Sequence, residues 1–308
     1  MSRSSLILGV DGGGTSTTAW LANREGLVLG RGLAGPSNAR AIGFETARRG
    51  LDHSIQTAFL DAGLELQPVE VACLGLAGYD RPIEKTWLED WARATPWHGR
   101  LILVNDGDLV VAAGTPDGWG VGLIAGTGSI AVGRDPEGRT ARAGGWGYLF
   151  GDEGSAYAVT LASLRKIARQ ADGRDESGSS VLWDRFREFL GIHSTGELVS
   201  TIYQEKFDRS RIASMAPMVV DSAEDDPSIF SEILRPAGLD LALLVEAVAC
   251  KLQFRSGPLP LAMAGSFLLN CEPIRRVLLN ELTTRGHEVL VSTVPDPVAG
   301  ALLLALRG

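Results

Sequence analysis

Two parts of the 308-residue chain repeat one pattern, a glycine-rich turn followed by a short polar hairpin. The Gly-Thr pair at residues 14–15 recurs at residues 126–127, and the hairpin turn at residues 23–26 (NREG) recurs at residues 135–138 (DPEG) with the same offset. Chance similarity between glycine turns is the alternative. Because two separate features keep one spacing, the pattern favours an internal duplication, and therefore two related halves.

Apolar runs bounded by glycine or polar clusters divide the chain into short strands and helices. Strands are predicted at residues 5–10, 16–22, 26–32, 69–78, 100–106, 258–266 and 288–293, and around the second glycine turn between residues 119 and 147. Helices are predicted at residues 44–62, 87–95, 107–114, 154–170, 183–190, 229–254, 274–284 and 297–306. Strands mixed with crossover helices predict an α/β fold with layers and some antiparallel hairpins.

Composition excludes several classes of function. A net charge of −8 leaves no general footprint for nucleic acid, although a local site can still bind ATP. Cys73, Cys250 and Cys271 are too widely spaced for a disulfide framework, a zinc site or an iron–sulfur cluster, so we expect buried thiols. None of the four histidines stands in a triad-like setting. We see neither a signal peptide nor a membrane span, and we expect a cytoplasmic protein.

The first glycine turn, Asp11-Gly12-Gly13-Gly14-Thr15, has two interpretations. Glycines let the backbone come close to a ligand, and their N–H groups can point at phosphate oxygens, with a Mg²⁺ ion between the acid and the phosphates. The alternative is a plain β-turn in which Asp11 is a turn former. No Gly-Lys-Ser/Thr follows, so this is not a Walker A loop, and strand-like residues follow where a dinucleotide fingerprint needs a helix.

A second turn and an acid at a strand end add to the first. Gly126-Thr127-Gly128 would face the first turn if the halves are pseudo-symmetric, and two facing turns could hold a phosphate pair. Asp106 ends a buried strand just before a helix, where a carboxylate can accept a hydroxyl proton. The alternatives are an ordinary hairpin turn and a helix N-cap. Asp108 is expected to be an exposed acid of the first helical turn.

Two further stretches could contact a ligand. In the stretch at residues 144–157 (GGWGYLFGDEGSAY), Trp146 could stack on a sugar, and Asp152 and Glu153 could accept hydrogen bonds from sugar hydroxyls. A loop with a core tryptophan and a helix-capping acid is the alternative. Gly265-Ser266 follows a strand and could lie close to an adenine ring, or could be a simple strand-to-helix turn.

In this order the motifs resemble the actin, heat-shock chaperone and sugar-kinase superfamily. They are most similar to the N-acetylglucosamine kinase group, which includes the BadF-BadG-BcrA-BcrD ATPases. Residues 10–15, 105–106, 115–129 and 144–157 carry the likeness. It implies two ribonuclease-H-like domains around an ATP cleft: residues 1–115, with a C-terminal helix at about 296–308 packed back on them, and residues 116–295 with a helical insertion. It also implies a homodimer.

The resemblance assigns a role to each matching residue. Asp106 matches the catalytic base, and Asp11 the acid that holds Mg²⁺ through water. The ATP phosphates would lie on Gly12, Gly13, Gly14, Thr15, Gly126, Thr127 and Gly128, the adenosine on Gly265 and Ser266, and the sugar on Asn38, Asp106, Thr127, Gly145, Trp146 and Asp152. Residues 166–255 show no motif that maps onto the family.

The expected activity is transfer of phosphate from ATP to the 6-hydroxyl of an amino sugar. N-acetylglucosamine, glucosamine and a muramic-acid-type sugar stay open as substrates. An ATP-hydrolysing activator or regulator of a partner protein is the alternative of another class, although the chain lacks the paired cysteines with which the reductase activators hold an iron–sulfur cluster. A binding protein without catalysis is disfavoured because Asp106 is present. No nucleic acid and no membrane are expected as partners.

Overall fold

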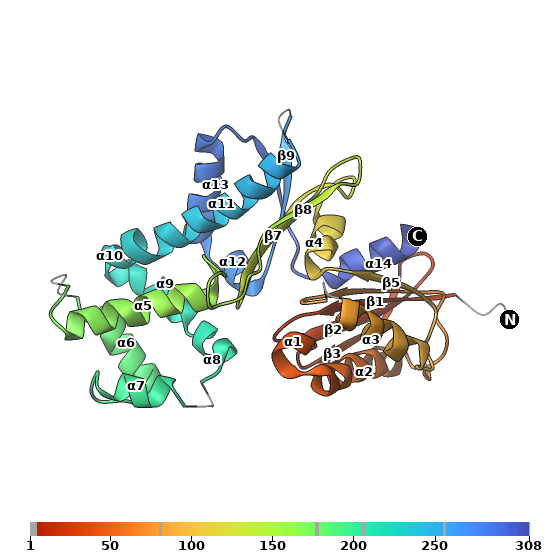
Figure 1. Ribbon diagram of the computed structural model, residues 1–308, viewed down its shortest axis with the longest axis horizontal. Coiled ribbons are helices and arrows are strands. Elements are labelled where there is room, and N and C mark those ends of the chain that lie inside the picture. The colour runs from red at the N-terminus through yellow and green to blue at the C-terminus, as the bar shows by residue number, and fades with distance from the viewer. Residues whose placement is uncertain (1–4, 80–81, 176–178, 205–206, 255–256, 308) are drawn as a thin grey trace.

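The computed structural model describes residues 5–79, 82–175, 179–204, 207–254 and 257–307. Two five-stranded sheets organise the molecule, with helices beside each and a group of helices extending from the second (Figure 1). The predicted α/β class is therefore confirmed. No helix in the described part of the chain is long and apolar enough to cross a membrane.

The first sheet has the strand order β3-β2-β1-β4-β5. Its strands are β1 (Leu6–Gly12), β2 (Thr17–Asn23), β3 (Val28–Ala34), β4 (Val71–Leu76) and β5 (Arg100–Val104). The hairpin strands β1, β2 and β3 pair antiparallel, whereas β1, β4 and β5 pair parallel. The central strands are almost wholly buried, as their continuous apolar runs require.

The second sheet repeats this arrangement with the order β10-β9-β6-β7-β8. Its strands are β6 (Gly120–Ala125), β7 (Ser129–Arg134), β8 (Thr140–Gly144), β9 (Leu259–Ala264) and β10 (Val289–Thr293). Read from the other edge, each strand stands where its counterpart stands in the first sheet, with the same parallel and antiparallel pairings. The two halves thus share one topology, as the predicted duplication requires.

The likeness extends to single hydrogen bonds in the hairpins. The Gly26 N–H donates to the Asn23 carbonyl at 3.0 Å, and the Gly138 N–H donates to the Asp135 carbonyl at the same distance. The Asn23 and Asp135 side chains then each accept from the backbone four residues on. Equivalent positions thus close equivalent turns, and these hairpins serve as scaffold.

Helices cover the sheets and build the insertion. Those of the first half are α1 (Ala39–Ile42), α2 (Phe44–Asp61), α3 (Pro82–Arg93) and α4 (Asp106–Gly114). Those of the second half are α5 (Ala156–Ala171), α6 (Val181–Leu190), α7 (Glu197–Ile202), α8 (Arg209–Ala213), α9 (Ala216–Asp225), α10 (Pro227–Ile229), α11 (Arg235–Lys251), α12 (Ser266–Asn270), α13 (Glu272–Thr284) and α14 (Val298–Arg307). A π-helical turn at Phe230–Leu234 joins α10 to α11, so the run predicted as one helix contains an irregularity.

Helix α4 packs against both sheets, and helix α14 packs on the first sheet beside it. Leu109 of α4 belongs to a buried cluster with strands β1 and β4, whereas Val110 packs with Ala262 and Ala264 of β9. Helix α14 comes from the end of the chain and lies against the first sheet beside α4 (Figure 1), where Leu302 joins the Leu109 cluster. The chain therefore passes into the second sheet and returns to the first.

The three cysteines differ in their surroundings. Cys73 in β4 and Cys271 are buried, as expected, and burial raises the pKa of the Cys73 thiol to about 12. Cys250 on α11 is exposed, so the expectation of a buried thiol is wrong there. Its position faces outward because the buried stripe of α11 runs through Val245, Val248 and Ala249.

Candidate active site

The two glycine turns lie against each other. The side-chain oxygens of Thr15 and Thr127, residues 112 apart and equivalent in the duplication, are 3.4 Å apart. Each turn joins the central strand of its sheet to the neighbouring hairpin strand, β1 to β2 and β6 to β7. Two symmetric loops rich in backbone N–H groups therefore meet at one point of the molecule.

The first turn is anchored at its base and open at its tip. Gly12 is buried, and a Cβ atom there would lie 2.3 Å from the Ser37 Oγ atom. The Gly13 N–H donates to the Ser16 carbonyl at 2.9 Å. Gly14 and Thr15 are exposed, and nothing lies within 4 Å of a Cβ built on Gly14. The tip thus leaves room for a ligand beside its backbone.

Two carboxylates lie beside the first turn. Burial and, second, the nearby charge of Asp106 raise the pKa of Asp11 from 3.8 to about 7. A carboxylate in this state is stabilised by a cation, because a positive charge offsets both causes of the shift. Oxygen ligands and a retained water shell suit Mg²⁺, so the pair fits a hydrated magnesium ion. No group of three or more His, Cys, Asp or Glu side chains among the described residues forms a dedicated metal cage.

Asp106 is the first residue of α4, but it is not the cap of that helix. Asn105 is the N-cap, and its side chain accepts from the Gly107 N–H at 3.3 Å. Asp108 completes a capping box by accepting from the Asn105 N–H at 3.1 Å. The expectation that Asp108 is exposed is therefore wrong, because this bond holds it half-buried against the helix start. The N-cap of α4 is therefore Asn105, and the Asp106 carboxylate also accepts from the Gly107 N–H at 3.0 Å.

The second turn is held by Asp152 and by an arginine that the sequence did not single out. The Gly126 N–H donates to the Gly128 carbonyl at 2.9 Å, which closes the turn. One Asp152 oxygen accepts from the Ser129 N–H at 3.1 Å, and the other accepts from Arg209 Nη2 at 2.7 Å. A Cβ atom on Gly128 would lie 2.2 Å from the same Nη2 atom, so a side chain at this position would displace the guanidinium.

Asp152 is 4% exposed and has a φ of +62°, a backbone conformation that favours glycine. Burial raises the pKa of Asp152, while the charge of Arg209 and the Ser129 hydrogen bond oppose that rise. The N-cap of α5 is Ser155, so the alternative in which an acid of this loop caps the helix is wrong. Asp152 belongs to the base of the second turn.

The remaining predicted sugar residues lie on both sides of the meeting point. Asn38 adjoins the first turn, because the Ser37 N–H donates to the Gly13 carbonyl at 3.1 Å. Its side chain caps α1 by accepting from the Arg40 N–H. On the other side, the Gly145 N–H donates to the Ser129 carbonyl at 3.0 Å.

The aromatic loop after β8 is open to solvent. Trp146 is 62% exposed, with the Arg142 guanidinium 5.7 Å from its ring centroid. The alternative of a core tryptophan is therefore wrong. A large exposed ring next to Gly145, and so next to the second turn, is available to cover a bound ligand.

The predicted adenosine turn adjoins the second phosphate turn. Gly265 has a φ of +95°, and a Cβ atom there would lie 2.4 Å from the Ala125 carbonyl oxygen. Ser266 follows as the exposed first residue of α12. The backbones that precede Gly126 and Ser266 therefore touch, which gives a continuous surface from one turn to the other.

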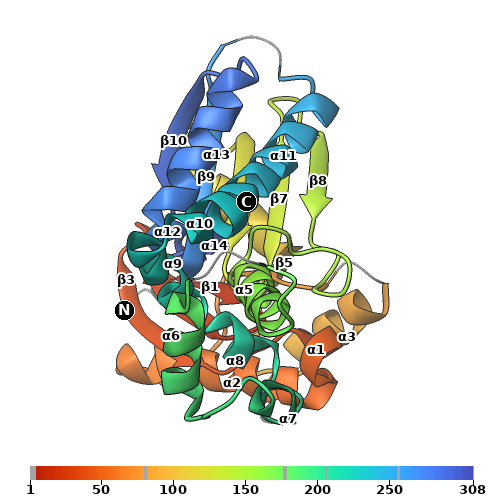
Figure 2. The same cartoon turned by 90° about the vertical axis from the view of Figure 1, so that its left-hand side faces the viewer.

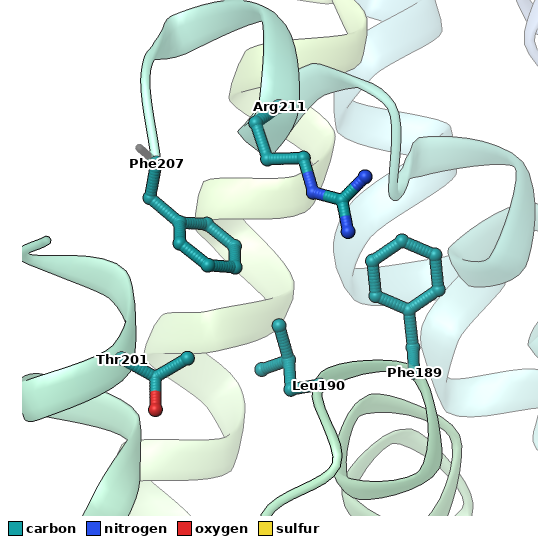
Figure 3. A pocket seen from close by; sticks show the side chains of 5 residues that line it. All are labelled: Phe189, Leu190, Thr201, Phe207 and Arg211. Carbon is teal, nitrogen blue, oxygen red and sulfur yellow. The ribbon is translucent and has the colours of Figure 1, made fainter. Parts of the chain in front are cut away.

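The described cavities lie away from these residues. One of about 420 Å³ lies within the insertion and is lined by Phe189, Leu190, Thr201, Phe207 and Arg211 (Figure 3). Another of about 380 Å³ lies between α3 and β5. The facing turns combine two carboxylates, free backbone groups and exposed rings, whereas the first cavity is mostly apolar. The chemistry favours the turns as the active site.

Comparison with known proteins gives close agreement over the whole chain. The profile of the BadF/BadG/BcrA/BcrD ATPase family matches residues 8–305. An N-acetylmuramic acid/N-acetylglucosamine kinase of Clostridium acetobutylicum is 31% identical over 300 residues, 97% of each chain. An N-acetyl-D-glucosamine kinase of Dictyostelium discoideum is 30% identical over 324 residues, 98% of each chain.

Solved structures agree in the fold. A candidate N-acetylglucosamine kinase from Chromobacterium violaceum superposes with a TM-score of 0.78 and 27% identity, covering 98% of this chain and 99% of that one. A ROK family glucokinase from Streptomyces griseus, solved with glucose and AMPPNP, gives a TM-score of 0.61 at 18% identity over 99% and 100% of the chains, and so shows the fold alone. The predicted actin-like sugar-kinase fold is confirmed. With its two equivalent halves and a profile match from one end to the other, the chain belongs to the BadF/BadG/BcrA/BcrD ATPase family.

Proposed function

We propose that the chain is an ATP-dependent kinase that phosphorylates the 6-hydroxyl of an amino sugar, with N-acetylglucosamine as the first candidate. The contact between Thr15 and Thr127 carries the proposal, because it brings two phosphate-type turns together beside the Asp11 and Asp106 carboxylates. Two relatives that align with nearly the whole chain are kinases of N-acetylated amino sugars, which supports the substrate class.

Asp106 is proposed as the general base. It would orient the sugar hydroxyl and accept its proton as phosphate is transferred. Phosphoryl transfer passes through a loose transition state and needs little early deprotonation, so an ordinary carboxylate suffices. Such a base contributes roughly 10²–10⁴-fold to the rate. Helix α4 packs on both sheets and holds this carboxylate firmly in place.

Asp11 is proposed to hold a hydrated Mg²⁺ ion that accompanies ATP. Bound there, the ion would neutralise charge on the phosphate oxygens. The residue's part is to keep a half-buried carboxylate at the base of the first turn. A cation beside it would lower the raised pKa of Asp11 and so stabilise the charged carboxylate.

The other roles follow the geometry of the two turns. The turns from Gly12 to Thr15 and from Gly126 to Gly128 are proposed to hold the phosphates, by N–H groups other than those of Gly13 and Gly126, which donate within the turns. Gly265 with Ser266 is proposed to hold the adenosine. Asn38, Thr127, Gly145, Trp146 and Asp152 are proposed to hold the sugar. Contacts from both halves would explain how binding closes the site and keeps water from competing as the phosphate acceptor.

We also propose how the molecule is divided and assembled. Residues 1–115, together with 296–308, would form one domain and residues 116–295 the other. The packing of α14 on the first sheet supports this division. A homodimer is proposed from the family resemblance alone, and the cytoplasm is proposed as the default compartment.

A screen of ADP release over hexoses, amino sugars and muramyl sugars tests the function. We expect at least a hundredfold stimulation by N-acetylglucosamine or a close relative, since a bound acceptor replaces water. If glucosamine or N-acetylmuramic acid is the best substrate, the proposed sugar is wrong but the proposed reaction stands. Hydrolysis of ATP that no sugar stimulates would favour an activator or regulator of a partner protein instead.

A further inference from the structure

One side chain of the helical insertion reaches the second glycine turn. Helix α8 packs against α5 in the insertion (Figures 1 and 2) and begins at Arg209. Asp208 caps it by accepting from the Arg211 N–H at 2.8 Å, which fixes the start of the helix. The cap sets the direction in which Arg209 leaves the backbone.

The contacts of Arg209 join it to three parts of the site. Nη2 donates to Asp152 at 2.7 Å and lies against the Cα atom of Gly128. The guanidinium carbon is 5.7 Å from the centroid of the Tyr148 ring, which belongs to the same loop as Trp146. Asp152 is the only hydrogen-bond partner of Arg209 among the described residues.

The ion pair between Arg209 and Asp152 also has features that destabilise the folded protein. The Nε atom of Arg209 is buried without a hydrogen-bond partner within the described part of the chain. A buried donor that bonds to nothing is unfavourable, as is burial of the Asp152 carboxylate. Replacing a buried ion pair by apolar residues is often neutral or stabilising, so stability alone is a weak explanation for the pair.

We infer that Arg209 is a positioning residue of the kinase site. It holds the Asp152 carboxylate charged and in place, and through Asp152 it holds the turn from Gly126 to Ser129. The inference rests on the proposed function, because Asp152 is proposed as a sugar ligand. The helical insertion would then contribute directly to sugar binding.

The charge on Asp152 gives the inference a distinctive signature. The charged or titratable groups around the pair are Glu153 and Tyr148 from the loop, Tyr157 and Arg165 from α5, and Tyr203. Arg165 and Tyr203 act on Tyr157, whereas Arg209 is the positive group that acts on Asp152. Without it, the burial of Asp152 and the charge of Glu153 act alone, and both favour the protonated carboxyl. A protonated Asp152 is a poorer acceptor for a sugar hydroxyl.

The test compares Arg209→Gln with Arg211→Gln. Both changes remove one positive charge from α8, but Arg211 lies in the cavity of Figure 3, with its guanidinium over the Phe189 and Phe207 rings. The sugar KM and kcat are measured at saturating Mg-ATP from about pH 6 to about pH 8.5. Values are taken relative to the parent protein at each pH, which removes the titration of Asp11 from the comparison.

We expect Arg209→Gln to raise the sugar KM by about threefold or more at about pH 6, because a higher pKa of Asp152 leaves less of this carboxyl charged at that pH. The rise should shrink toward about pH 8.5, and Arg211→Gln should stay within about twofold throughout. Arg209→Lys keeps the charge but not the planar fork, so it should show a smaller rise with the same pH trend. If Arg209→Gln does not fold, the comparison is made with Arg209→Lys instead.

Other outcomes overturn the inference. A loss of equal size at every pH would mean that Arg209 only supports the fold. Arg209 variants that match Arg211→Gln would remove any role at the site. In a background of Asp152→Asn, Arg209→Gln should add little, and full additivity would show that the two residues act independently. A parent protein that phosphorylates no amino sugar would overturn the proposed function, and this inference with it.

Discussion

At the scale of single residues, Asp106 and Asn105 divide two tasks between them. Asn105 caps α4, and the Asp106 carboxylate, which accepts from the Gly107 N–H, lies near Asp11 of the first glycine turn. Replacement of Asp106 by Asn should therefore leave the fold intact and reduce kcat for sugar phosphorylation by about 10²–10⁴-fold. Coupled ADP release measures the rate, and the melting temperature checks the fold. Near-full turnover would mean that another group accepts the proton.

The pKa of Asp11 predicts a pH-dependent stability. The folded protein holds a proton on this carboxyl up to a pH of about 7, whereas the ordinary value is 3.8. The folded state therefore binds more protons than the unfolded state in that interval, and the stability of the metal-free protein falls as the pH rises through it. Asn does not titrate. The melting temperature of Asp11→Asn should thus exceed that of the parent by a margin that widens from about pH 4 to about pH 7.

Magnesium provides the control for this prediction. Mg-ATP should narrow the margin at about pH 8 by raising the melting temperature of the parent more than that of Asp11→Asn, because a ligand that binds the folded state stabilises it. A margin that does not change with pH would show that Asp11 is not titrating in this range. A variant that loses sugar affinity but keeps its Mg-ATP affinity would show that the proposed role is wrong.

At the scale of elements, the capping box of α4 links stability to catalysis. Asn105→Ala removes the N-cap side chain, one of two acceptors of the Gly107 N–H, and should cost about 1 kcal/mol. Loss of the cap also loosens the turn that carries Asp106, so kcat should fall by more than the sugar KM changes. Thermal unfolding and steady-state kinetics check both parts. Asn105→Ser, which can also cap, is the matched control and should retain most of the activity.

Local signals predicted most elements of the two sheets and both glycine turns. Apolar runs ended by glycine marked β1, β4 and β9, and the repeated spacing marked the duplication. The short helices α7, α8 and α9 were missed, because tertiary packing rather than periodicity stabilises helices of so few residues. The turn at Phe230–Leu234 was missed because a π-helical step leaves the apolar pattern of a long helix almost unchanged.

The same limit applies to the site. Asp106, Asp11 and the glycines stand at strand ends, where the sequence alone indicates chemistry. Arg209 is 57 residues from its partner Asp152, and nothing in its neighbourhood distinguishes it from the other arginines of the insertion. Such a pair exists only once the chain has folded. The sequence pattern therefore predicted the residues proposed to bind phosphate, but it did not predict that Arg209 of the insertion contacts Asp152.

At the scale of the whole molecule, α14 should protect the first sheet. A Cβ atom on Gly300 would lie 2.0 Å from the Leu109 carbonyl oxygen, so Gly300→Val should force α14 away from α4. Overpacking of this kind costs about 1–3 kcal/mol or more. Cys73 lies in the same cluster and should then become accessible to a thiol reagent.

Counting reactive thiols measures this. The native protein should expose Cys250 alone, Gly300→Val should add Cys73, and the denatured chain should expose all three cysteines. Cys271 is the internal control, because it is buried in the core of the second half. Equal labelling of Cys271 and Cys73 in the variant would indicate global unfolding rather than release of one helix.

The packing of the C-terminal helix α14 on the first sheet also affects how the protein folds during synthesis on the ribosome. The first sheet is synthesised by residue 104, yet its covering helix starts at residue 298. At about 5–20 residues per second, the wait is roughly 10–40 s. During that time the face around Ile7, Val71 and Cys73 has no cover from α14 and is open to association with other nascent chains. The first sheet is thus synthesised early but covered late, so we expect a chaperone that binds nascent chains to bind this half.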